Sequence, residues 1–306
     1  GRRAEPDAPP APRPHAVISL SILEAGLVNG LLTGGVYALV ALGLTLIYGV
    51  LHIVNFAHGS LLMIAMFGGW MLVSWAHLDP YAALPLMVVI MFVIGWGLYA
   101  GVIGRISGGD DRRILLATLG VAIVLDNLAL VLFTGDTRTI ETPYQFAVVE
   151  AGPLLLSVPK LISFGVAIVL ALLLWAFMAL TDTGRAIRAV AREPDGARLV
   201  GIRPGRIFAL SYGIGIACLG AAGCLLLPSF YVSPQVGNVF VLTAFTIVVL
   251  GGMGSFPGAV VGGLLIGVTE SLGGLFLGES LGPIGISLVF ILVLLFRPTG
   301  LFRAAR

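Results

Sequence analysis

Two interruptions of otherwise apolar sequence hold the residues best suited to recognise a small polar solute. Asn55 and His58 lie within HIVNFAHGS (52–60), and a glycine- and proline-rich break, GGMGSFPGA (251–259), lies in the other half of the chain. An amide and an imidazole both donate and accept hydrogen bonds, and breaks at glycine and proline free backbone groups to do the same. These residue types indicate recognition through hydrogen bonds rather than covalent catalysis.

Groups for catalysis, metal binding or nucleotide hydrolysis are missing from the sequence. The four histidines are scattered and no HExxH pattern occurs, so we predict no catalytic residues and no metal ligands. The only lysine is Lys160, which excludes the phosphate-binding pattern GxxxxGK[ST]. Cys218 and Cys224 are separated by about 9 Å along one predicted helix, too far for a disulfide. We expect no cofactor in this chain, so any ATP that drives it is hydrolysed by another chain.

Composition places the chain in a lipid bilayer. Of its 306 residues, 58% are hydrophobic and only 10% are charged, and the mean hydropathy is +1.06, whereas about a quarter of a soluble domain is charged. The net charge of +2 gives no support for nucleic-acid binding. We predict an all-α polytopic membrane protein, with a disordered Pro-rich tail at 1–16 and a single transmembrane domain at 17–306.

Apolar segments follow one another from Val17 onward. The clear segments are about 35–52, 59–76, 82–104, 114–134, 159–181, 206–228, 240–253, 257–275 and 283–302, with a weaker one at about 17–33. We expect 8–10 transmembrane elements, some of them short or broken. Arginine-rich loops favour the cytoplasm, so both chain ends are predicted inside and the acidic loop 135–158 outside. This arrangement requires 17–33 to cross separately and 240–275 to form a hairpin of two short elements broken at Gly254–Pro257.

The longest hydrophilic segment between apolar spans, 182–206, carries six arginines against three acids. It is predicted to be cytoplasmic and to form two short helices. Asp182 or Thr183 caps the first helix, Glu193-Pro194 separates the two, and Gly201 marks a stop. One face collects Ile187, Val190 and Ala191, and another collects Ala197, Val200 and Gly201. Such a pair offers a surface to another protein; a loop that only fixes topology is the alternative.

In a membrane protein the two interruptions at 52–60 and 251–259 also predict broken helices within the membrane. Broken helices at membrane depth are tolerated only where the freed backbone groups are buried in protein or line a wet cavity. Breaks in corresponding halves point to a translocation pathway, and the loose match of NFAHGS (55–60) with GSFPGA (254–259) suggests an internal repeat. The predicted pathway residues are Asn55, His58, Gly59, Gly251, Gly252, Gly254 and Pro257. The alternative is that the glycines only allow tight packing and the histidines lie at the interface.

Further polar residues occur inside the apolar segments, namely Glu24, Asp126, Asn127 and Glu270. Intramembrane polar groups are functional candidates by default, and hydrogen bonds between helices explain them about as well. No arginine or lysine is an obvious countercharge at mid-membrane, so a proton- or sodium-coupled relay is unsupported.

Four blocks, in order along the chain, carry a family resemblance. They are GGVYALVALGLTLIYGVLHIVNFAHGSLLMI (34–64), RAIRAVAREPDGARLVGI (185–202), AFTIVVLGGMGSFPGAVVGGLLIG (244–267) and LLFRPTGLF (294–302). The sequence resembles the permeases of branched-chain amino-acid ABC importers, specifically the first of that system's two permease subunits (the LivH type). The resemblance covers nearly the whole chain from about residue 25. Gly196, where relatives more often have alanine, is a mild departure.

The resemblance implies a multi-pass permease of the bacterial inner (plasma) membrane that pairs with a second, homologous permease. The pair would sit on two cytoplasmic ABC ATPase subunits, which hold ATP and Mg, and a periplasmic substrate-binding protein would feed it. The chain itself would be a transport subunit and not an enzyme. The family's pattern for coupling to the ATPase falls on Arg185, Arg188, Ala191, Glu193, Ala197, Leu199 and Gly201.

The implied substrates are branched-chain or similar small amino acids. Permeases of this type are also similar to subunits of urea and short-chain amide importers, and no residue in this chain separates those substrates. A stand-alone ion-coupled secondary transporter or channel would show mid-span charge pairs, which are missing, and would leave the structured arginine-rich loop unexplained. A membrane-embedded enzyme or a scaffold lacks any constellation of catalytic groups.

Overall fold

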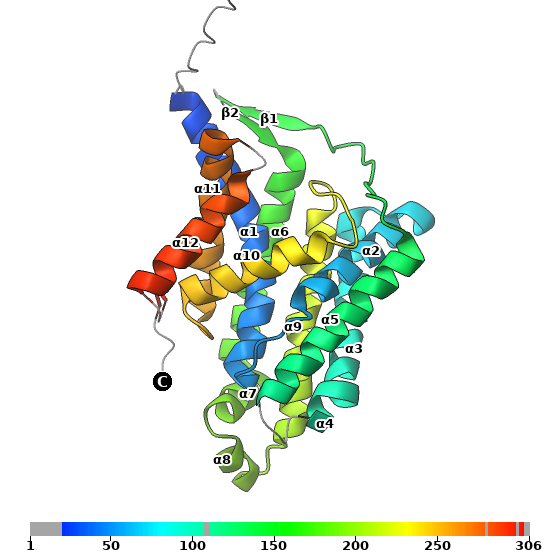
Figure 1. The fold of residues 1–306 in the computed structure, drawn as a ribbon, viewed down its shortest axis with the longest axis vertical. Coiled ribbons are helices and arrows are strands. Elements are labelled where there is room, and N and C mark those ends of the chain that lie inside the picture. Colours follow the sequence, from blue (N-terminus) through cyan, green and yellow to red (C-terminus); the bar gives the residue numbers. More distant parts are fainter. Residues whose placement is uncertain (1–19, 107–110, 153, 279–280, 298–299, 303–306) are drawn as a thin grey trace, which may run out of the picture.

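The computed structural model describes residues 20–106, 111–152, 154–278, 281–297 and 300–302. Most of these residues are helical, and the prediction of an all-α polytopic membrane protein is confirmed. The helices form one elongated bundle with a β-hairpin at one end and two short helices at the other (Figure 1). The tail predicted at 1–16 lies outside the described residues.

The elements follow the apolar segments of the sequence closely. In chain order they are α1 Leu20–Leu51, α2 His58–Ala76, α3 Pro80–Leu98, the π-helical turn η1 Tyr99–Ile103, α4 Gly104–Ile106, α5 Asp111–Phe133, β1 Val148–Ala151, β2 Leu154–Ser157, α6 Val158–Leu180, α7 Asp182–Arg192, α8 Pro194–Leu199, α9 Pro204–Leu226, α10 Val236–Gly251, α11 Phe256–Leu277 and α12 Gly282–Phe296. Within the described residues, seven helical segments are long and apolar enough to cross a membrane, and α10 and α12 are shorter apolar helices. These elements fall within the predicted range of 8–10.

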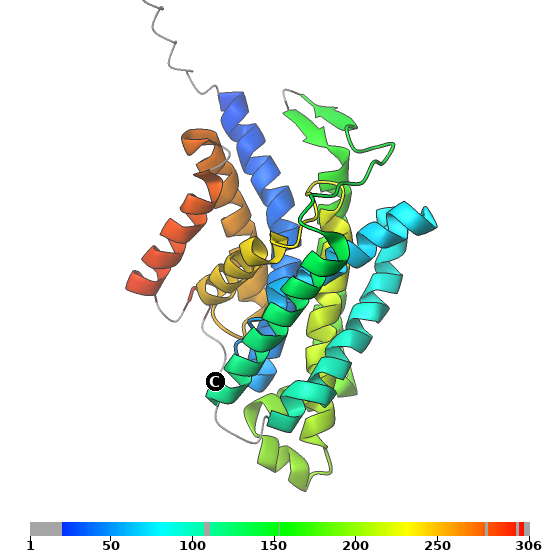
Figure 2. The same ribbon diagram turned by 45° about the vertical axis from the view of Figure 1, so that its right-hand side comes forward.

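The structure of α1 differs from the prediction for the first membrane crossing of the chain. The weak segment 17–33 and the clear segment 35–52 form one continuous helix of 32 residues, about 48 Å long. It starts at the hairpin end of the bundle and ends beside α7 at the opposite end (Figures 1 and 2). Because arginines mark the α7–α8 end as the inner one, α1 starts at the outer end. The prediction that 17–33 crosses separately from an inner N-terminus is therefore wrong.

Backbone-to-backbone packing joins α1 to α11. A Cβ atom added at Gly267 would lie 2.4 Å from the Cα of Gly34, and one added at Gly263 would lie 2.5 Å from the Cα of Ala38. Lipid tails are as apolar as leucine, so helices in a bilayer associate through such close packing rather than through the hydrophobic effect. Glycine at these positions lets α11 run along α1 in direct contact, with α6, α9 and α10 packed on other sides of α1.

The predicted hairpin at 240–275 is one short helix and one long one. Helix α10 has 16 residues and α11 has 22, so the expectation of two short elements is wrong for α11. The break falls at 252–255, because the Ser255 hydroxyl accepts the Gly258 amide at 3.2 Å and Pro257 occupies the first turn of α11. Helix α10 runs across the long axis of the bundle (Figure 1).

The acidic loop 135–158, predicted to lie outside, is at the end of the bundle opposite α7 and α8 (Figure 1) and contains a hairpin that the sequence did not indicate. Strands β1 and β2 pair antiparallel there. The Tyr144 hydroxyl donates to Asp79, and the Arg138 guanidinium lies 4.6 Å from the centroid of the Trp70 ring. Partial burial and the bond to Asp79 raise the pKa of Tyr144, so its phenol stays protonated and keeps donating. These contacts hold the loop against α2 and against the connection between α2 and α3.

The substitution Gly267→Ala is expected to destabilise the protein by about 1–3 kcal/mol, because the added methyl would overlap the backbone of α1. Gly120→Ala on α5 is the matched control, since a Cβ there has no heavy atom within 4 Å. Thermal unfolding of the purified protein in detergent compares the two. Equal stability of both variants would show that α1 and α11 do not pack this closely.

Candidate functional site

The first interruption folds back into the middle of the bundle. After α1 ends at Leu51, His52 takes a left-handed conformation with φ of 56° and turns the chain. The following residues return along α1, and α2 begins at His58, whose ring lies beside Val40. Val40 is about three turns of α1 before Leu51, so α2 begins about 16 Å above the inner end of α1. A helix that starts at this depth is the broken element that the sequence predicted.

Asn55 and His58 are buried with hydrogen-bonding capacity left over. Both are at most 1% exposed. His58 Nε2 lies 3.0 Å from the carbonyl oxygen of Val40, so in a neutral ring this nitrogen carries the proton and Nδ1 is an acceptor. Asn55 Oδ1 accepts the Ala57 amide at 3.1 Å. Among the described residues Asn55 Nδ2 and His58 Nδ1 make no hydrogen bond of good geometry, although the Tyr212 hydroxyl lies near the Asn55 amide. The amide N–H groups of Asn55 and the imidazole acceptor of His58 therefore have capacity for a water molecule or a polar solute.

Gly59 brings the start of α2 against the start of α10. A Cβ atom at Gly59 would lie 2.2 Å from the carbonyl oxygen of Gly237, and one at Gly237 would lie 2.5 Å from that of Gly59. The two helix starts are therefore in backbone contact. Helix α10 is anchored at the depth of Asn55 and His58.

The second interruption lies elsewhere in the bundle. Gly252 and Gly254 have φ of 95° and 85°, which favours glycine. Gly254 packs beside Gly49, near the inner end of α1, where a Cβ on Gly49 would lie 3.3 Å from the Cα of Gly254. Gly49 and Val40 are about 13 Å apart along α1. The structure therefore does not bring the two predicted groups of pathway residues together.

The remaining residues of the second interruption differ in exposure. Gly251 and Gly252 are buried, whereas Pro257 is exposed. The carbonyl of Gly251 accepts the amide of Phe302, so the end of the described chain covers this turn. The two motifs of the suggested repeat, 55–60 and 254–259, have one structural feature in common, because each contains the start of a helix, α2 or α11. The pathway role of these residues stays a prediction.

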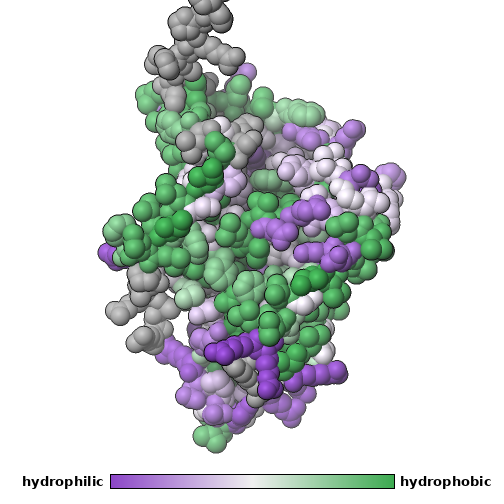
Figure 3. Space-filling model, in the orientation of Figure 1, coloured by the Kyte–Doolittle hydropathy of each residue, from purple (hydrophilic) through white to green (hydrophobic). Residues whose placement is uncertain are grey.

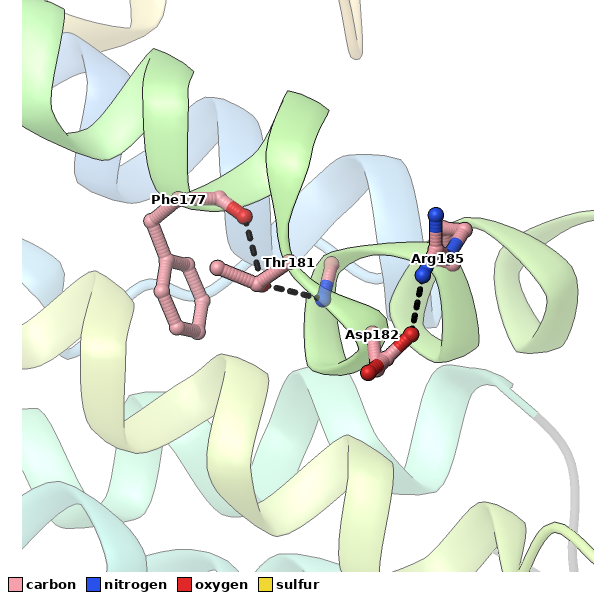
Figure 4. A network of polar contacts seen from close by, with 5 residues as sticks. Phe177, Thr181, Asp182 and Arg185 are labelled. Atoms are coloured by element: carbon pink, nitrogen blue, oxygen red, sulfur yellow. Dashed lines mark hydrogen bonds and ion pairs between the residues drawn. The ribbon is translucent and has the colours of Figure 1, made fainter.

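The arginine-rich segment forms the two predicted helices at the inner end, separated at Glu193 and followed by Gly201 with φ of 85°. The Thr181 hydroxyl accepts the Gly184 amide at 3.0 Å and donates to the Phe177 carbonyl at 2.7 Å (Figure 4). The cap of α7 is therefore Thr181, one residue before the predicted Asp182. Asp182 instead pairs with Arg185 on the surface.

Burial divides the predicted coupling residues of α7 and α8 into two kinds. Ala197 is buried, and Ala191 is half-buried, so these positions pack the helices rather than face outward. Leu199 is 90% exposed and Val200 is 76% exposed. The other outward positions among the predicted residues are Arg185, Arg188, Glu193 and Gly201. Hydrophobic atoms lie at the very tip of this end, with hydrophilic residues around them (Figure 3).

A basic hollow adjoins this apolar tip. It is open, has a volume of about 660 Å³, and its lining includes Arg198, Gly201, Arg203 and Arg206. Arg198 is paired with Asp195 at 2.8 Å, whereas Arg203 and Arg206 have no ion pair in the described part of the chain. The tip and the hollow together suit a partner groove that is apolar at its centre and acidic at its edge.

Multiple membrane-spanning helices, a helix that starts at mid-depth and an exposed helical pair at the inner end define a membrane transport subunit. A family model described as "Branched-chain amino acid transport system / permease component" matches residues 26–297. The chain belongs to this family of permeases, as the four sequence blocks indicated. It is accordingly a multi-pass protein of the inner membrane with a transport role and not an enzymatic one.

Named relatives agree with this assignment. The chain is 33% identical over 289 residues to the high-affinity branched-chain amino acid transport system permease protein BraD of Pseudomonas aeruginosa, covering 90% of this chain and 94% of that protein. It is 32% identical to LivH of Salmonella typhimurium, covering 89% of this chain and 93% of that one. LivH of Escherichia coli K12 shows the same identity and coverage.

His58→Leu is expected to impair transport while the protein still inserts. Leucine removes the hydrogen bond to the Val40 carbonyl, which keeps its partner within α1, and the loss of one such bond costs about 0.5–1.5 kcal/mol. His58→Gln keeps a donor and is the matched variant. Uptake by the complete transporter in vesicles, normalised to the amount of permease in the membrane, measures the effect. Unchanged uptake kinetics in His58→Leu would exclude this position from the pathway.

Proposed function

We propose that this chain is the membrane-spanning subunit of an ATP-driven importer for branched-chain amino acids or closely related small amino acids. Its family and the names of BraD and LivH support this substrate class. The sequence has no phosphate-binding pattern, so two cytoplasmic ATPase subunits hold the ATP and Mg and hydrolyse the nucleotide. A second, homologous permease and a periplasmic binding protein complete the transporter.

The observation that carries the proposal is the exposed tip of α7 and α8. Leu199 and Val200 present apolar side chains to the aqueous phase, which is unfavourable unless a partner covers them. Arg188 is exposed on α7, and Arg203 and Arg206 line the adjoining hollow. In this proposal the apolar tip fills a groove of an ATPase subunit and the arginines meet acidic residues at its edge.

The contacts of α7 explain how a displacement of α7 and α8 would be transmitted to the membrane-spanning helices. Ile187 and Val190 are fully buried, and α7 packs against α1, α6 and α9. A Cβ atom at Gly184 would lie 2.3 Å from the carbonyl oxygen of Met178, so the joint between α6 and α7 is closely packed. A joint this tight transmits a displacement of the helical pair instead of absorbing it. ATP-driven movement of the ATPases would then switch the spans between outward- and inward-facing states.

The competing functions receive less support. Permeases for urea or short-chain amides share this type of chain, but BraD and LivH are named as permeases of branched-chain amino acid transport systems. A stand-alone ion-coupled transporter requires charge pairs along its spans. The contact ion pairs among the described residues are Arg185–Asp182 and Arg198–Asp195, both on the inner surface, and the charges of Lys160 and Glu270 in the outer half of the bundle form none.

The complete complex in proteoliposomes is expected to import leucine uphill when ATP is supplied on the ATPase side. Omission of the ATPase subunits is expected to abolish accumulation, because this chain supplies no energy source of its own. Radiolabelled leucine and urea, tested at equal concentrations, separate the two substrate classes. Uphill transport by the permease chain alone would refute the proposal, and preferential import of urea would refute the substrate class.

Leu199→Asp, alone or with Val200→Asp, is expected to reduce ATP-driven uptake at least about tenfold. Burying an unpaired carboxylate in an apolar groove costs more than the ~1.4 kcal/mol that corresponds to tenfold. Leu155→Asp in the outer hairpin, also an exposed leucine, is the matched control. Uptake and co-purification of the ATPase subunits are both measured. Normal uptake and co-purification in the Leu199→Asp protein would show that the tip does not dock.

A further inference from the structure

Two oppositely charged side chains, Lys160 and Glu270, lie inside the outer half of the bundle. They belong neither to the α7–α8 surface nor to the site at the start of α2. Lys160, the only lysine of the chain, is the third residue of α6. Glu270 lies on α11, about 10 Å below the outer end of that helix. Both side chains are half-buried. Charged groups within membrane segments are costly and lie toward the protein interior or a watery space, where they mark solute pathways.

Lys160 and Glu270 attract each other without forming a contact ion pair in the described structure. The Lys160 ammonium instead donates a long hydrogen bond of 3.5 Å to Asn29 Oδ1 on α1. The Glu270 carboxylate interacts with the hydroxyl of Tyr37, also on α1. An ammonium donates three hydrogen bonds and a carboxylate accepts about four. Each charge therefore keeps capacity for a further partner of opposite sign.

The space beside Lys160 combines hydroxyl groups with apolar walls. A cavity of about 10 Å³ adjoins the lysine, and its lining includes Thr33, Ser229, Val36, Leu225 and Phe230. Its volume is close to that needed by one water molecule. The cavity surface is mainly apolar, which suits a branched apolar side chain, and the lining residues Thr33 and Ser229 carry hydroxyls that can donate to a carboxylate beside the ammonium.

Aromatic rings link this cavity to Glu270. Phe230 packs edge-to-face on Phe240 with ring centroids 5.6 Å apart, and Phe240 packs in the same way on Tyr37 at 5.8 Å. Tyr37 is the neighbour of Glu270. Phe240 lies about one turn along α10 from Gly237, where α10 touches the start of α2. The row of rings therefore joins the two charges and leads toward Asn55 and His58.

We propose that Lys160 and Glu270 hold the two ends of a zwitterionic amino acid in an outer recognition site. Lys160, with Thr33 and Ser229, binds the α-carboxylate, and Glu270, with Tyr37, binds the α-ammonium. The rings of Phe230 and Phe240 contact the apolar side chain. The water-sized cavity lies between α1, α6 and α9 and corresponds to a closed form of the site, so entry of the amino acid requires α6 to move away from α1 while α11 stays packed on it. This inference rests on the proposed function, because it assigns the parts of that substrate.

The single lysine allows a direct binding assay on the full chain. Purified protein is acetylated with an amine-reactive reagent, and modification of Lys160 is measured by mass spectrometry relative to the N-terminal amine, which corrects for reagent consumed by added amino acid. Leucine at millimolar concentration is expected to lower this ratio at least about threefold, while urea leaves it unchanged. An unchanged ratio with leucine, or equal protection by urea, overturns the site.

Transport by the complete complex provides the second readout. Lys160→Met and Glu270→Gln are each expected to lower the rate of leucine import at saturating leucine-loaded binding protein about 10- to 100-fold, since each removes a charge-assisted hydrogen bond to substrate. Lys160→Arg keeps the charge and is expected to retain most of the activity. Glu24→Gln, which removes an exposed carboxylate at the outer end of α1, is the control. A wild-type rate of leucine import in either neutralised variant overturns the inference.

The double variant separates substrate binding from a structural charge pair. Removing both charges is expected to impair import more than either single change if each charge holds one end of the substrate. Recovery of wild-type import in the double variant would assign the pair to structure alone and overturn the site. Import of leucine by the unmodified complex tests the proposed function separately, so failure of one is distinguishable from failure of the other.

Discussion

Close backbone packing between α1 and α11 is the constraint on which the rest of the bundle depends. Within a bilayer, apolar side chains gain little by moving from lipid to protein, so helices must approach closely enough for dispersion and weak polar contacts to hold them. Gly263 and Gly267 permit that approach. With α1 fixed in this way, its remaining faces place the broken start of α2, the joint between α6 and α7, and the outer charges relative to one another.

Three polar features lie along α1 at successive depths. Asn29 and Tyr37 neighbour the outer charges, the carbonyl of Val40 holds His58, and the inner end of the helix contacts α7. One continuous helix therefore connects the proposed outer recognition site, the mid-depth pair and the helical pair α7–α8 at the inner end. Movement of α7 against α1 would reach all three levels, as the proposed coupling to a separate ATPase requires.

Local sequence signals predicted α7 and α8 well, and longer-range features poorly. The hydroxyl cap, Glu193-Pro194 and Gly201 are signals that act within a few residues of one another, so they predicted the limits of both helices. The observed cap, Thr181, is one residue before the predicted Asp182. The sequence predicted a weak element at 17–33 and a separate clear one at 35–52, yet packing on α11 keeps α1 continuous. The approach of Lys160 to Glu270 joins α6 to α11, residues that only the tertiary fold brings near, and no local pattern signals it.

The unpaired arginines at the inner end have a consequence for the lipid as well as for the protein. The cytoplasmic leaflet carries anionic headgroups whose negative surface potential attracts basic side chains by about 1 kcal/mol each. Arg203 and Arg206, at the base of the helical pair, lie where this potential would attract them. The membrane surface would thereby orient α7 and α8 before any partner arrives, and a preoriented surface loses less rotational freedom on association.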